Sequence, residues 1–135
     1  MNMERLIHGL CHIAVMVKDI KKSVEFYESV LDFKTIFSYT DPDGDLVSFV
    51  ENDGCVLELF QPPVPPEHRT DGPVDHIAFA VTDIEAVVEE LKKRGIRIDN
   101  DTVTHWPTCF PNGAKWATFR GPDGEYLEVM EIAPY

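Results

Sequence analysis

The chain repeats itself, and this repeat constrains the fold more than any other feature of the sequence. Residues 12–20 match residues 76–84 at an offset of 64 residues, with six of nine positions identical. A second match, between residues 49–58 and 119–128, keeps Phe, Asp, Gly, Leu and Glu in step at an offset of 70 residues. Two matches in the same order predict a duplicated supersecondary unit whose second copy carries six extra residues.

Each copy begins with a strand pattern followed by a helix pattern. Residues 11–17 are apolar and rich in β-branched side chains, which favours a strand, and Asp19 stands where a helix N-cap is expected. In the second copy Asp83 is the expected cap and Gly95 the expected stop. The apolar residues at helical spacing, which predict one buried face per helix, are Ile20, Val24, Tyr27 and Leu31, then Ile84, Val87, Val88 and Leu91.

Three shorter strands are expected after each helix. They are predicted near residues 33–39, 46–51 and 55–60, and again near 96–98, 115–119 and 125–131. The dipeptides Asp53-Gly54 and Asp123-Gly124 are typical of hairpin turns. The expected fold class is α+β, with two tandem β-α-β-β-β modules forming a curved mixed sheet around a cavity.

Prolines divide the chain into these modules. We expect a single domain over residues 1–135, with module one at 8–61 and module two at 73–133. The segment 62–72 is the expected linker, since its prolines exclude a helix or a central strand. The loop 104–114 is the expected site of the insertion in the second copy.

Composition excludes several classes of function. With 135 residues and 44% hydrophobic content the chain can bury a hydrophobic core of its own. A net charge of −12 repels nucleic-acid phosphates and anionic lipid, and no apolar run approaches the ~20 residues of a membrane span. We therefore expect neither nucleic-acid nor membrane binding.

Cysteine usage and the N-terminal residues bear on the compartment. The number of cysteines is odd and no CxxC motif occurs, which argues against a disulfide framework and against a thiolate zinc site. The N-terminus lacks the basic and apolar stretches of a signal peptide. A cytoplasmic protein is expected, and Cys11, whose side chain would point away from that of His12, is expected in the core.

Strand alternation places one His and one Glu of each copy on a common face. Side chains alternate between faces along a strand, and the branched aliphatic side chains are expected to meet the helix. His12 in the first strand and Glu58 in the fourth then lie on the opposite face, and His76 and Glu128 repeat the arrangement. If the sheets curl around one cavity, all four side chains can converge.

A divalent cation makes the burial of these carboxylates tolerable. A lone ionised Glu is costly to bury and neighbouring carboxylates repel each other, whereas a dication supplies the largest local charge. Mixed nitrogen and oxygen ligation suits Ni²⁺, Zn²⁺ or Co²⁺, and also Mn²⁺ or Fe²⁺. The predicted metal ligands are His12, Glu58, His76 and Glu128.

Further side chains are candidates for contact with a small-molecule substrate. These candidates are Met16, Phe60, Met130, Trp106 and Lys115. Trp116 is expected to pack in the core, and His105 is expected to be exposed.

Several motifs together point to a known family. They are His12-Ile-Ala-Val, Phe26-Tyr-Glu-Ser-Val-Leu31, Leu57-Glu-Leu59, Asp75-His-Ile-Ala78 and Gly121-Pro-Asp-Gly-Glu-Tyr-Leu-Glu128. In these motifs the chain resembles, from about residue 8 to 132, the vicinal oxygen chelate superfamily of glyoxalase I, methylmalonyl-CoA epimerase, extradiol dioxygenases, and fosfomycin and bleomycin resistance proteins. It is most similar to small bacterial glyoxalase I proteins, which use His, Glu, His and Glu.

The resemblance implies an activity and an assembly. It implies a metal-dependent lyase or isomerase of the lactoylglutathione lyase type, acting on a 2-oxoaldehyde–thiol adduct by proton transfer alpha to a carbonyl. By the resemblance Glu128 is the expected catalytic base and Glu58 shuttles the proton or acts as its catalytic partner, and the sequence leaves open which of the two glutamates is the base. It also implies a homodimer, in which one chain supplies His12 and Glu58 and the other supplies His76 and Glu128; the alternative is that all four residues come from one chain.

Other activities stay open. Glutathione-using members resemble each other in an Arg four residues after the first His and an Asn four residues after the first Glu, where this chain has Met16 and Pro62. Neither side chain can bind a glutathione carboxylate, so the thiol is left open. A methylmalonyl-CoA epimerase-like enzyme and a metal-free binding or resistance protein are the alternatives. Extradiol dioxygenases and fosfomycin transferases are disfavoured because they use two His and one Glu.

Overall fold

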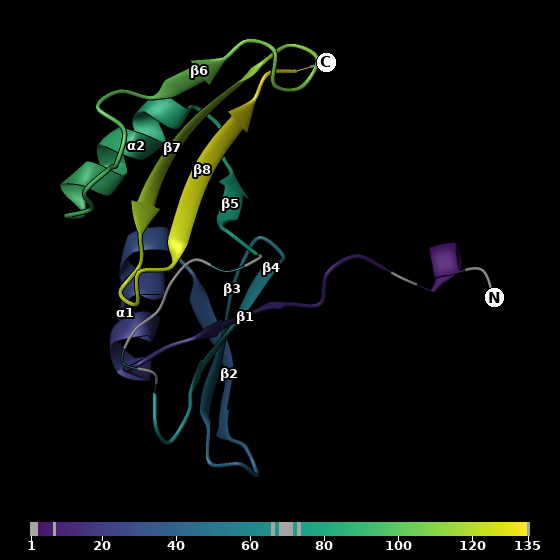
Figure 1. The fold of residues 1–135 in the computed structure, drawn as a ribbon, viewed down its shortest axis with the longest axis vertical. Helices are drawn as coiled ribbons and strands as arrows, with labels where there is room; N and C mark the ends of the chain where they lie inside the picture. Colours follow the sequence, from purple (N-terminus) through teal and green to yellow (C-terminus); the bar gives the residue numbers. More distant parts are fainter. Residues whose placement is uncertain (1–2, 7, 66, 68–71, 73, 135) are drawn as a thin grey trace. The chain divides into compact units, whose positions relative to one another are not determined.

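The chain folds into two compact units. In the computed structural model, which describes residues 3–6, 8–65, 67, 72 and 74–134, unit one is Met1–Pro66 and unit two is Glu67–Tyr135 (Figure 1). The boundary between the units falls inside the expected linker, of which residues 66 and 68–71 lie outside the described part.

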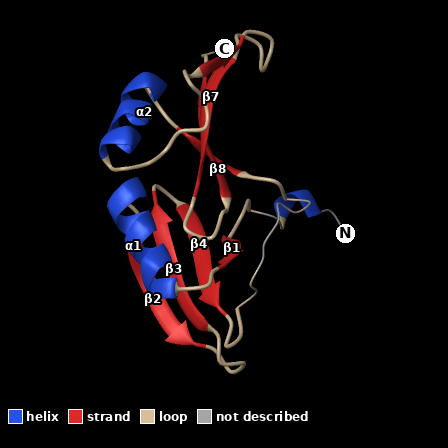
Figure 2. Cartoon of the chain, turned by 60° about the vertical axis from the view of Figure 1, so that its left-hand side comes forward, coloured by secondary structure: helices blue, strands red, loops and turns tan. Residues whose placement is uncertain are grey.

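Unit one contains one four-stranded mixed sheet and one long helix. After a short 3-10 helix, Met3–Arg5, its elements are β1 (Ile13–Met16), α1 (Ile20–Leu31), β2 (Lys34–Thr40), β3 (Leu46–Asn52) and β4 (Cys55–Gln61). The strand order is β1-β4-β3-β2, with β1 parallel to β4 and the other pairs antiparallel. Figure 2 shows α1 lying along this sheet.

Unit two repeats the topology. Its elements are β5 (Ile77–Ala80), α2 (Ile84–Lys93), β6 (Thr104–Trp106), β7 (Ala114–Arg120) and β8 (Tyr126–Ile132). The strand order is β5-β8-β7-β6, again with one parallel pair, β5 and β8. The predicted α+β fold of tandem β-α-β-β-β modules is confirmed, with the predicted sheet formed as two four-stranded sheets.

Both helices begin at the predicted aspartates. The Asp19 carboxylate accepts hydrogen bonds from the backbone N–H groups of Lys21 (3.1 Å) and Lys22 (3.3 Å), and Asp83 accepts one from Ala86 (3.3 Å). These bonds satisfy donors that the first helical turn leaves open. No helix in the described ranges combines the length and apolar character needed to cross a lipid bilayer.

The cores form where each helix meets its sheet. Val15, Val17, Leu57 and Leu59 are buried in unit one, as the alternation predicted. On α1 only Tyr27 of the predicted stripe is completely buried, and Ile20, Val24 and Leu31 are half-buried. The buried apolar residues of unit two are Ile84, Val88, Leu91, Ala114, Ala117, Phe119, Leu127 and Val129.

The predicted strand at residues 96–98 is wrong. The backbone N–H groups of Gly95 and Ile96 bond to carbonyls in the last turn of α2, so this segment completes the helix end. The backbone N–H of Asp99 then donates a hydrogen bond to the Thr118 carbonyl, and the side-chain oxygen of Asn100 accepts one from the Thr118 N–H. The strand that pairs with β7 is β6, which lies in the segment predicted as loop 104–114.

The two β-hairpins that carry the acidic residues have turns of different length. Between β3 and β4, Asp53 (φ 48°) and Gly54 (φ 82°) form a two-residue turn with positive φ at both positions, as in a type I′ turn. Between β7 and β8, residues 121–125 make a five-residue connection from Arg120 to Tyr126. The register of each hairpin is set by its turn.

This difference in turn length changes which residue lies opposite each Glu on the neighbouring strand. Glu58 pairs across the sheet with Phe49, whereas Glu128 pairs with Thr118. Phe119, which matches Phe49 in the sequence repeat, pairs with Leu127 and is completely buried. A one-residue change of register moves a side chain to the other face of a sheet, and that change separates the two phenylalanines.

The cysteines lie outside disulfides. All three are among the described residues and are free; Cys55 and Cys109 are half-buried and Cys11 is exposed. The expectation that Cys11 belongs to the core is wrong, because Cys11 lies two residues before Ile13, where β1 and its pairing with β4 begin.

Candidate functional site

In unit one, His12 and Glu58 lie together on the sheet face opposite α1. β1 and β4 are parallel, with Ala14 beside Glu58, and His12 immediately precedes β1. The His12 Nε2 and Glu58 Oε2 atoms are 3.2 Å apart, and the side chains are 35% and 25% exposed. The ring of Phe49 contacts the His12 imidazole edge-on, at 5.5 Å between ring centroids.

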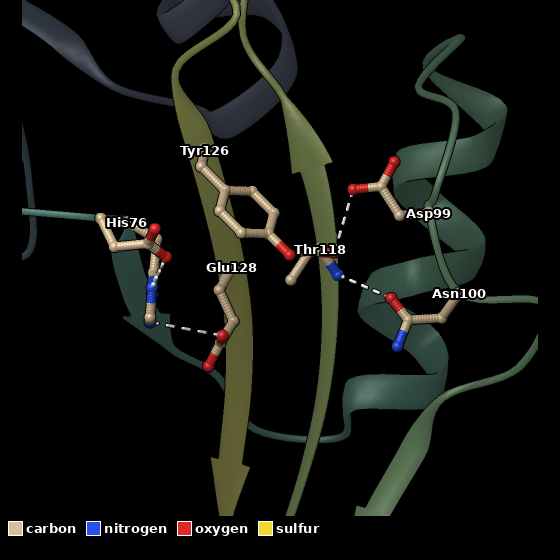
Figure 3. A network of polar contacts seen from close by, with 7 residues as sticks. His76, Asp99, Asn100, Thr118, Tyr126 and Glu128 are labelled. Atoms are coloured by element: carbon tan, nitrogen blue, oxygen red, sulfur yellow. Dashed lines mark hydrogen bonds and ion pairs between the residues drawn. The ribbon is translucent and has the colours of Figure 1, made fainter. Parts of the chain in front are cut away.

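Unit two holds the matching pair in a more buried setting. β5 and β8 are parallel, with Ala78 beside Glu128, and His76 immediately precedes β5. The His76 Nε2 and Glu128 Oε2 atoms are 3.5 Å apart (Figure 3). Glu128 is only 8% exposed, and its Oε1 accepts no hydrogen bond from any residue that the structure describes.

The electrostatics of Glu128 follow from this burial. Desolvation raises the pKa of the Glu128 carboxyl, and the nearby His76 opposes part of that shift. A buried polar atom without a partner costs about 1–3 kcal/mol. An additional positive partner at Oε1 would remove this cost.

The paired side chains have the chemistry of metal ligands. Each pair combines an imidazole nitrogen with a carboxylate oxygen, the donor types of mixed zinc, nickel and cobalt sites. The buried Glu128 oxygen without a hydrogen bond also fits a cation. Within the ranges described, no group of three or more His, Cys, Asp or Glu residues could hold an ion.

A polar network lies next to the Glu128 pair. The Tyr126 ring contacts His76 edge-on at 5.8 Å between centroids, and its hydroxyl lies 3.4 Å from the Thr118 hydroxyl (Figure 3). Thr118 in turn donates its hydroxyl to Asp99 (2.9 Å) and its backbone N–H to the Asn100 side chain (3.0 Å). These bonds fix the strand next to Glu128.

The predicted substrate-contacting residues separate into two groups. Met16 and Phe60 are neighbours on β1 and β4, and each lies on the same strand face as the His or Glu of unit one. Met130 pairs with Trp116 across β8 and β7, and the Trp106 ring packs edge-on against Trp116 at 5.1 Å. These three lie on the Glu128 face.

Lys115 is not brought to the Glu128 face. It points to the other side of β7, where its Nζ lies 2.8 Å from Glu85 Oε1 on α2. This ion pair lowers the pKa of Glu85 and raises that of Lys115. Trp116 is half-buried with its Nε1 unpartnered among the described residues, and His105 is exposed as expected.

Sequence reasoning gave no role to Asp75. Its Oδ2 lies 2.9 Å from Nδ1 of His76, on the ring edge away from the nitrogen that faces Glu128. The only signal available in the sequence was that Asp75 directly precedes a candidate ligand.

Comparison with known proteins identifies relatives over most of the chain. The family model of the Glyoxalase/Bleomycin resistance protein/Dioxygenase superfamily matches residues 9–129. The uncharacterized protein YwbC of Bacillus subtilis is 31% identical, covering 89% of this chain and 94% of that protein. A probable lactoylglutathione lyase of Vibrio cholerae is 27% identical, covering 92% and 91%. The solved glyoxalase family protein from Enterococcus faecalis superposes with a TM-score of 0.75 at 25% identity, covering 93% and 99%.

Other similar proteins have different names. Human mitochondrial methylmalonyl-CoA epimerase is 31% identical over 96 residues, which are 65% of this chain and 54% of that protein. The fosfomycin resistance protein FosX of Listeria monocytogenes, solved as a mutant complexed with Mn(II), has a TM-score of 0.66 at 22% identity, covering 91% and 89%. At that identity the likeness shows the fold alone.

Proposed function

The chain belongs to the Glyoxalase/Bleomycin resistance protein/Dioxygenase superfamily, and from this premise we propose that it is a divalent-metal-dependent lyase or isomerase of the glyoxalase I type. The proposed substrate is the adduct of a 2-oxoaldehyde and a thiol, in which a proton moves between adjacent carbons. One observation carries the proposal: a buried glutamate, Glu128, lies beside His76 with one oxygen unbonded within the described chain. The module repeat supplies a second His–Glu pair.

We propose His12, Glu58, His76 and Glu128 as the residues that hold the cation. Two neutral imidazoles and two carboxylates balance the charge of a dication, and the ligands must be deprotonated to bind it. When bound, Ni²⁺, Zn²⁺ or Co²⁺ supplies Lewis-acid stabilisation of negative charge that develops on the substrate.

The glutamates are proposed to move the proton. Glu128 takes the proton alpha to the carbonyl, and Glu58 is its partner in delivering a proton to the neighbouring carbon. The poor solvation of Glu128 supports this role, because a carboxylate with little water around it interacts more strongly with groups in the site. Met16, Phe60, Met130 and Trp106 are proposed to contact the substrate.

The proposal does not specify the thiol part of the substrate. Met16 and Pro62, both half-buried, stand where glutathione-using relatives have groups that bind a carboxylate. An apolar side chain offers no hydrogen bond to an ionised thiol carrier. The activity assay should therefore compare glutathione with other low-molecular-weight thiols.

We propose a homodimer in which each site is shared. One chain supplies His12 and Glu58, and the other supplies His76 and Glu128. Sharing of this kind follows the twofold symmetry that most homodimers adopt, since each such interface then contains two equivalent sites.

The experiment that tests the proposal begins with elemental analysis of the protein as isolated. Metal-free protein is then reloaded with Ni²⁺, Zn²⁺, Co²⁺ or Mn²⁺ and assayed with methylglyoxal and several thiols. Glu58→Gln and Glu128→Gln are each expected to lower bound metal and turnover together. If both variants keep full metal content and full turnover, the proposal is wrong.

A second candidate is a 2-methylacyl-CoA epimerase, which is supported by the similarity to the human epimerase. That reaction also removes a proton alpha to a carbonyl, so it would require the same proton transfer by Glu128 and Glu58. Exchange of the alpha proton of methylmalonyl-CoA in deuterated buffer, measured beside the methylglyoxal assay, distinguishes the two. A metal-free binding protein would show neither activity and no bound cation.

A further inference from the structure

His76 is contacted at both of its ring nitrogens. Its Nδ1 lies 2.9 Å from Oδ2 of Asp75, and its Nε2 lies 3.5 Å from Oε2 of Glu128. The Tyr126 ring lies edge-on to the imidazole, at 5.8 Å between centroids, and limits how far the ring can turn. The orientation of His76 is therefore defined on three sides.

Both partners are carboxylates that can only accept, so the lengths of the two contacts decide which nitrogen carries the proton. An ionised carboxylate can only accept, so the Asp75 bond requires a hydrogen on Nδ1 of His76. In a neutral imidazole this leaves the Nε2 lone pair free on the side of Glu128. The opposite tautomer would exchange the 2.9 Å hydrogen bond to Asp75 for an N–H directed at the Glu128 carboxylate 3.5 Å away, which is a longer and weaker contact.

The first module lacks this arrangement. At the offset of 64 residues, the position of Asp75 is taken by Cys11, whose thiol is exposed and cannot act as a carboxylate. The imidazole of His12 is contacted by the Phe49 ring instead. The two histidines of the repeat are thus oriented by different means.

We propose that Asp75 is a positioning residue that holds His76 in the Nδ1–H tautomer, with Nε2 directed to the side of Glu128 and available to a divalent cation. Metal-binding histidines commonly donate their second N–H to a carboxylate, which fixes the tautomer and the ring orientation. This inference rests on the proposed function only in taking Nε2 as a metal ligand.

The exposure of the Asp75–His76 pair predicts that its loss should not change the stability of the protein. The side chains of His76 and Asp75 are 41% and 58% exposed, and ion pairs this accessible to water contribute little to stability. Replacing Asp75 should therefore leave the unfolding transition where it is, and change the tautomer and the metal affinity. If Asp75 had only a structural role, replacing it would shift the unfolding transition and leave the tautomer and the metal affinity unchanged.

The tautomer is measured first, in metal-free, ¹⁵N-labelled protein at a pH about two units above the ordinary imidazole pKa. Long-range ¹H–¹⁵N spectra should show a protonated Nδ1 and an unprotonated Nε2 for His76. Asp75→Ala should shift the population toward the other tautomer, and Asp75→Asn, whose amide oxygen can still accept, should preserve it. Cys11→Ala, at the matching position of module one, should leave both histidines unchanged.

Metal affinity is measured second, by competition titration with Zn²⁺ alone. Asp75→Ala should weaken binding roughly tenfold, the lower end of the effect typical for such carboxylates, and Cys11→Ala should not. An unprotonated Nδ1 in the wild-type protein, or an unchanged tautomer in Asp75→Ala, would overturn the inference. If the wild-type protein binds no Zn²⁺ while the tautomer responds as expected, the proposed metal function fails and the tautomer control by Asp75 stands.

Discussion

Glu128 and His76 form an incompletely satisfied pair, because only one oxygen of the buried carboxylate faces the imidazole. The Glu128 Oε2 lies 3.5 Å from His76 Nε2, and Oε1 has no hydrogen-bond partner in the described part of the chain. In the other unit the corresponding Glu58 is 25% exposed, so water can solvate it. The two glutamates should therefore respond differently to the loss of their charge.

Replacing Glu128 with Leu should stabilise the metal-free protein. The change removes a buried carboxylate with an unsatisfied oxygen and adds apolar surface, so the free energy of unfolding should rise by about 1–2 kcal/mol. Denaturant unfolding of the metal-free protein measures this. Glu58→Leu is the matched control and should change stability by less than about 0.5 kcal/mol, as is usual at solvated positions. A clear loss of stability in Glu128→Leu would contradict the burial argument.

Mixed dimers should show whether the site is shared. His12→Ala and His76→Ala subunits, co-expressed with different tags and purified as heterodimers, would form one intact and one doubly altered site if each site uses both chains. Activity should then reach about half that of the wild-type dimer, because a twofold dimer holds two equivalent sites. Each parent homodimer serves as the inactive control. A heterodimer as inactive as its parents would indicate that both pairs come from the same chain.

The half-buried Cys55 should react more slowly with iodoacetamide than the exposed Cys11. Burial raises the pKa of the Cys55 thiol, and the neighbouring Glu51 carboxylate raises it further. A raised pKa means less thiolate at neutral pH, so alkylation is slower and its pH midpoint moves upward. Mass spectrometry over a pH series follows each site separately.

Glu51→Gln provides the control for this charge effect. It removes the negative charge but keeps an oxygen that can accept the Gly54 N–H, the bond that Glu51 makes in the turn. Alkylation of Cys55 should become faster, with its pH midpoint lowered, and Cys11 should be unaffected. An unchanged midpoint for Cys55 would mean that the Glu51 charge does not act on the thiol.

Phe119 and Phe49 should contribute unequally to stability, although they match in the sequence repeat. Phe119 is completely buried on the helix-facing side, so Phe119→Ala should cost about 3–5 kcal/mol. Phe49 is half-buried beside His12, and Phe49→Ala should cost roughly half as much because less apolar area is lost. Urea unfolding of the two variants provides the comparison, and equal losses of stability would contradict the different registers of the two hairpins.

Much of each module follows from local sequence. Alternating side chains predicted that Val15 and Leu57 are buried, and an aspartate before an apolar stripe predicted the helix starts. The same alternation put His12 on the face of Glu58, and the structure has these side chains 3.2 Å apart. Periodicity is a local property, so a single sequence carries it. The convergence of the two pairs on one cation stays a prediction.

The two incorrect predictions, the strand at residues 96–98 and the burial of Cys11, depend on interactions that sequence periodicity does not reveal. Residues 96–98 have apolar character suited to a strand, but Gly95 and Ile96 bond back to the end of α2, and the Asn100 side chain occupies the edge of β7. The alternation rule fails for Cys11, which lies two residues before the first residue that pairs with β4, Ile13. In both cases, hydrogen bonds between parts of the chain determine where a strand begins.

The unequal hairpin turns allow the two copies of the repeat to evolve separate surroundings for the same ligand type. A five-residue connection in place of Asp53-Gly54 gives one glutamate a hydroxyl neighbour and the other an aromatic one. Loop length is among the changes that folded proteins tolerate most easily. Shortening the second connection is therefore a route by which an engineer could restore symmetry to a duplicated half-site.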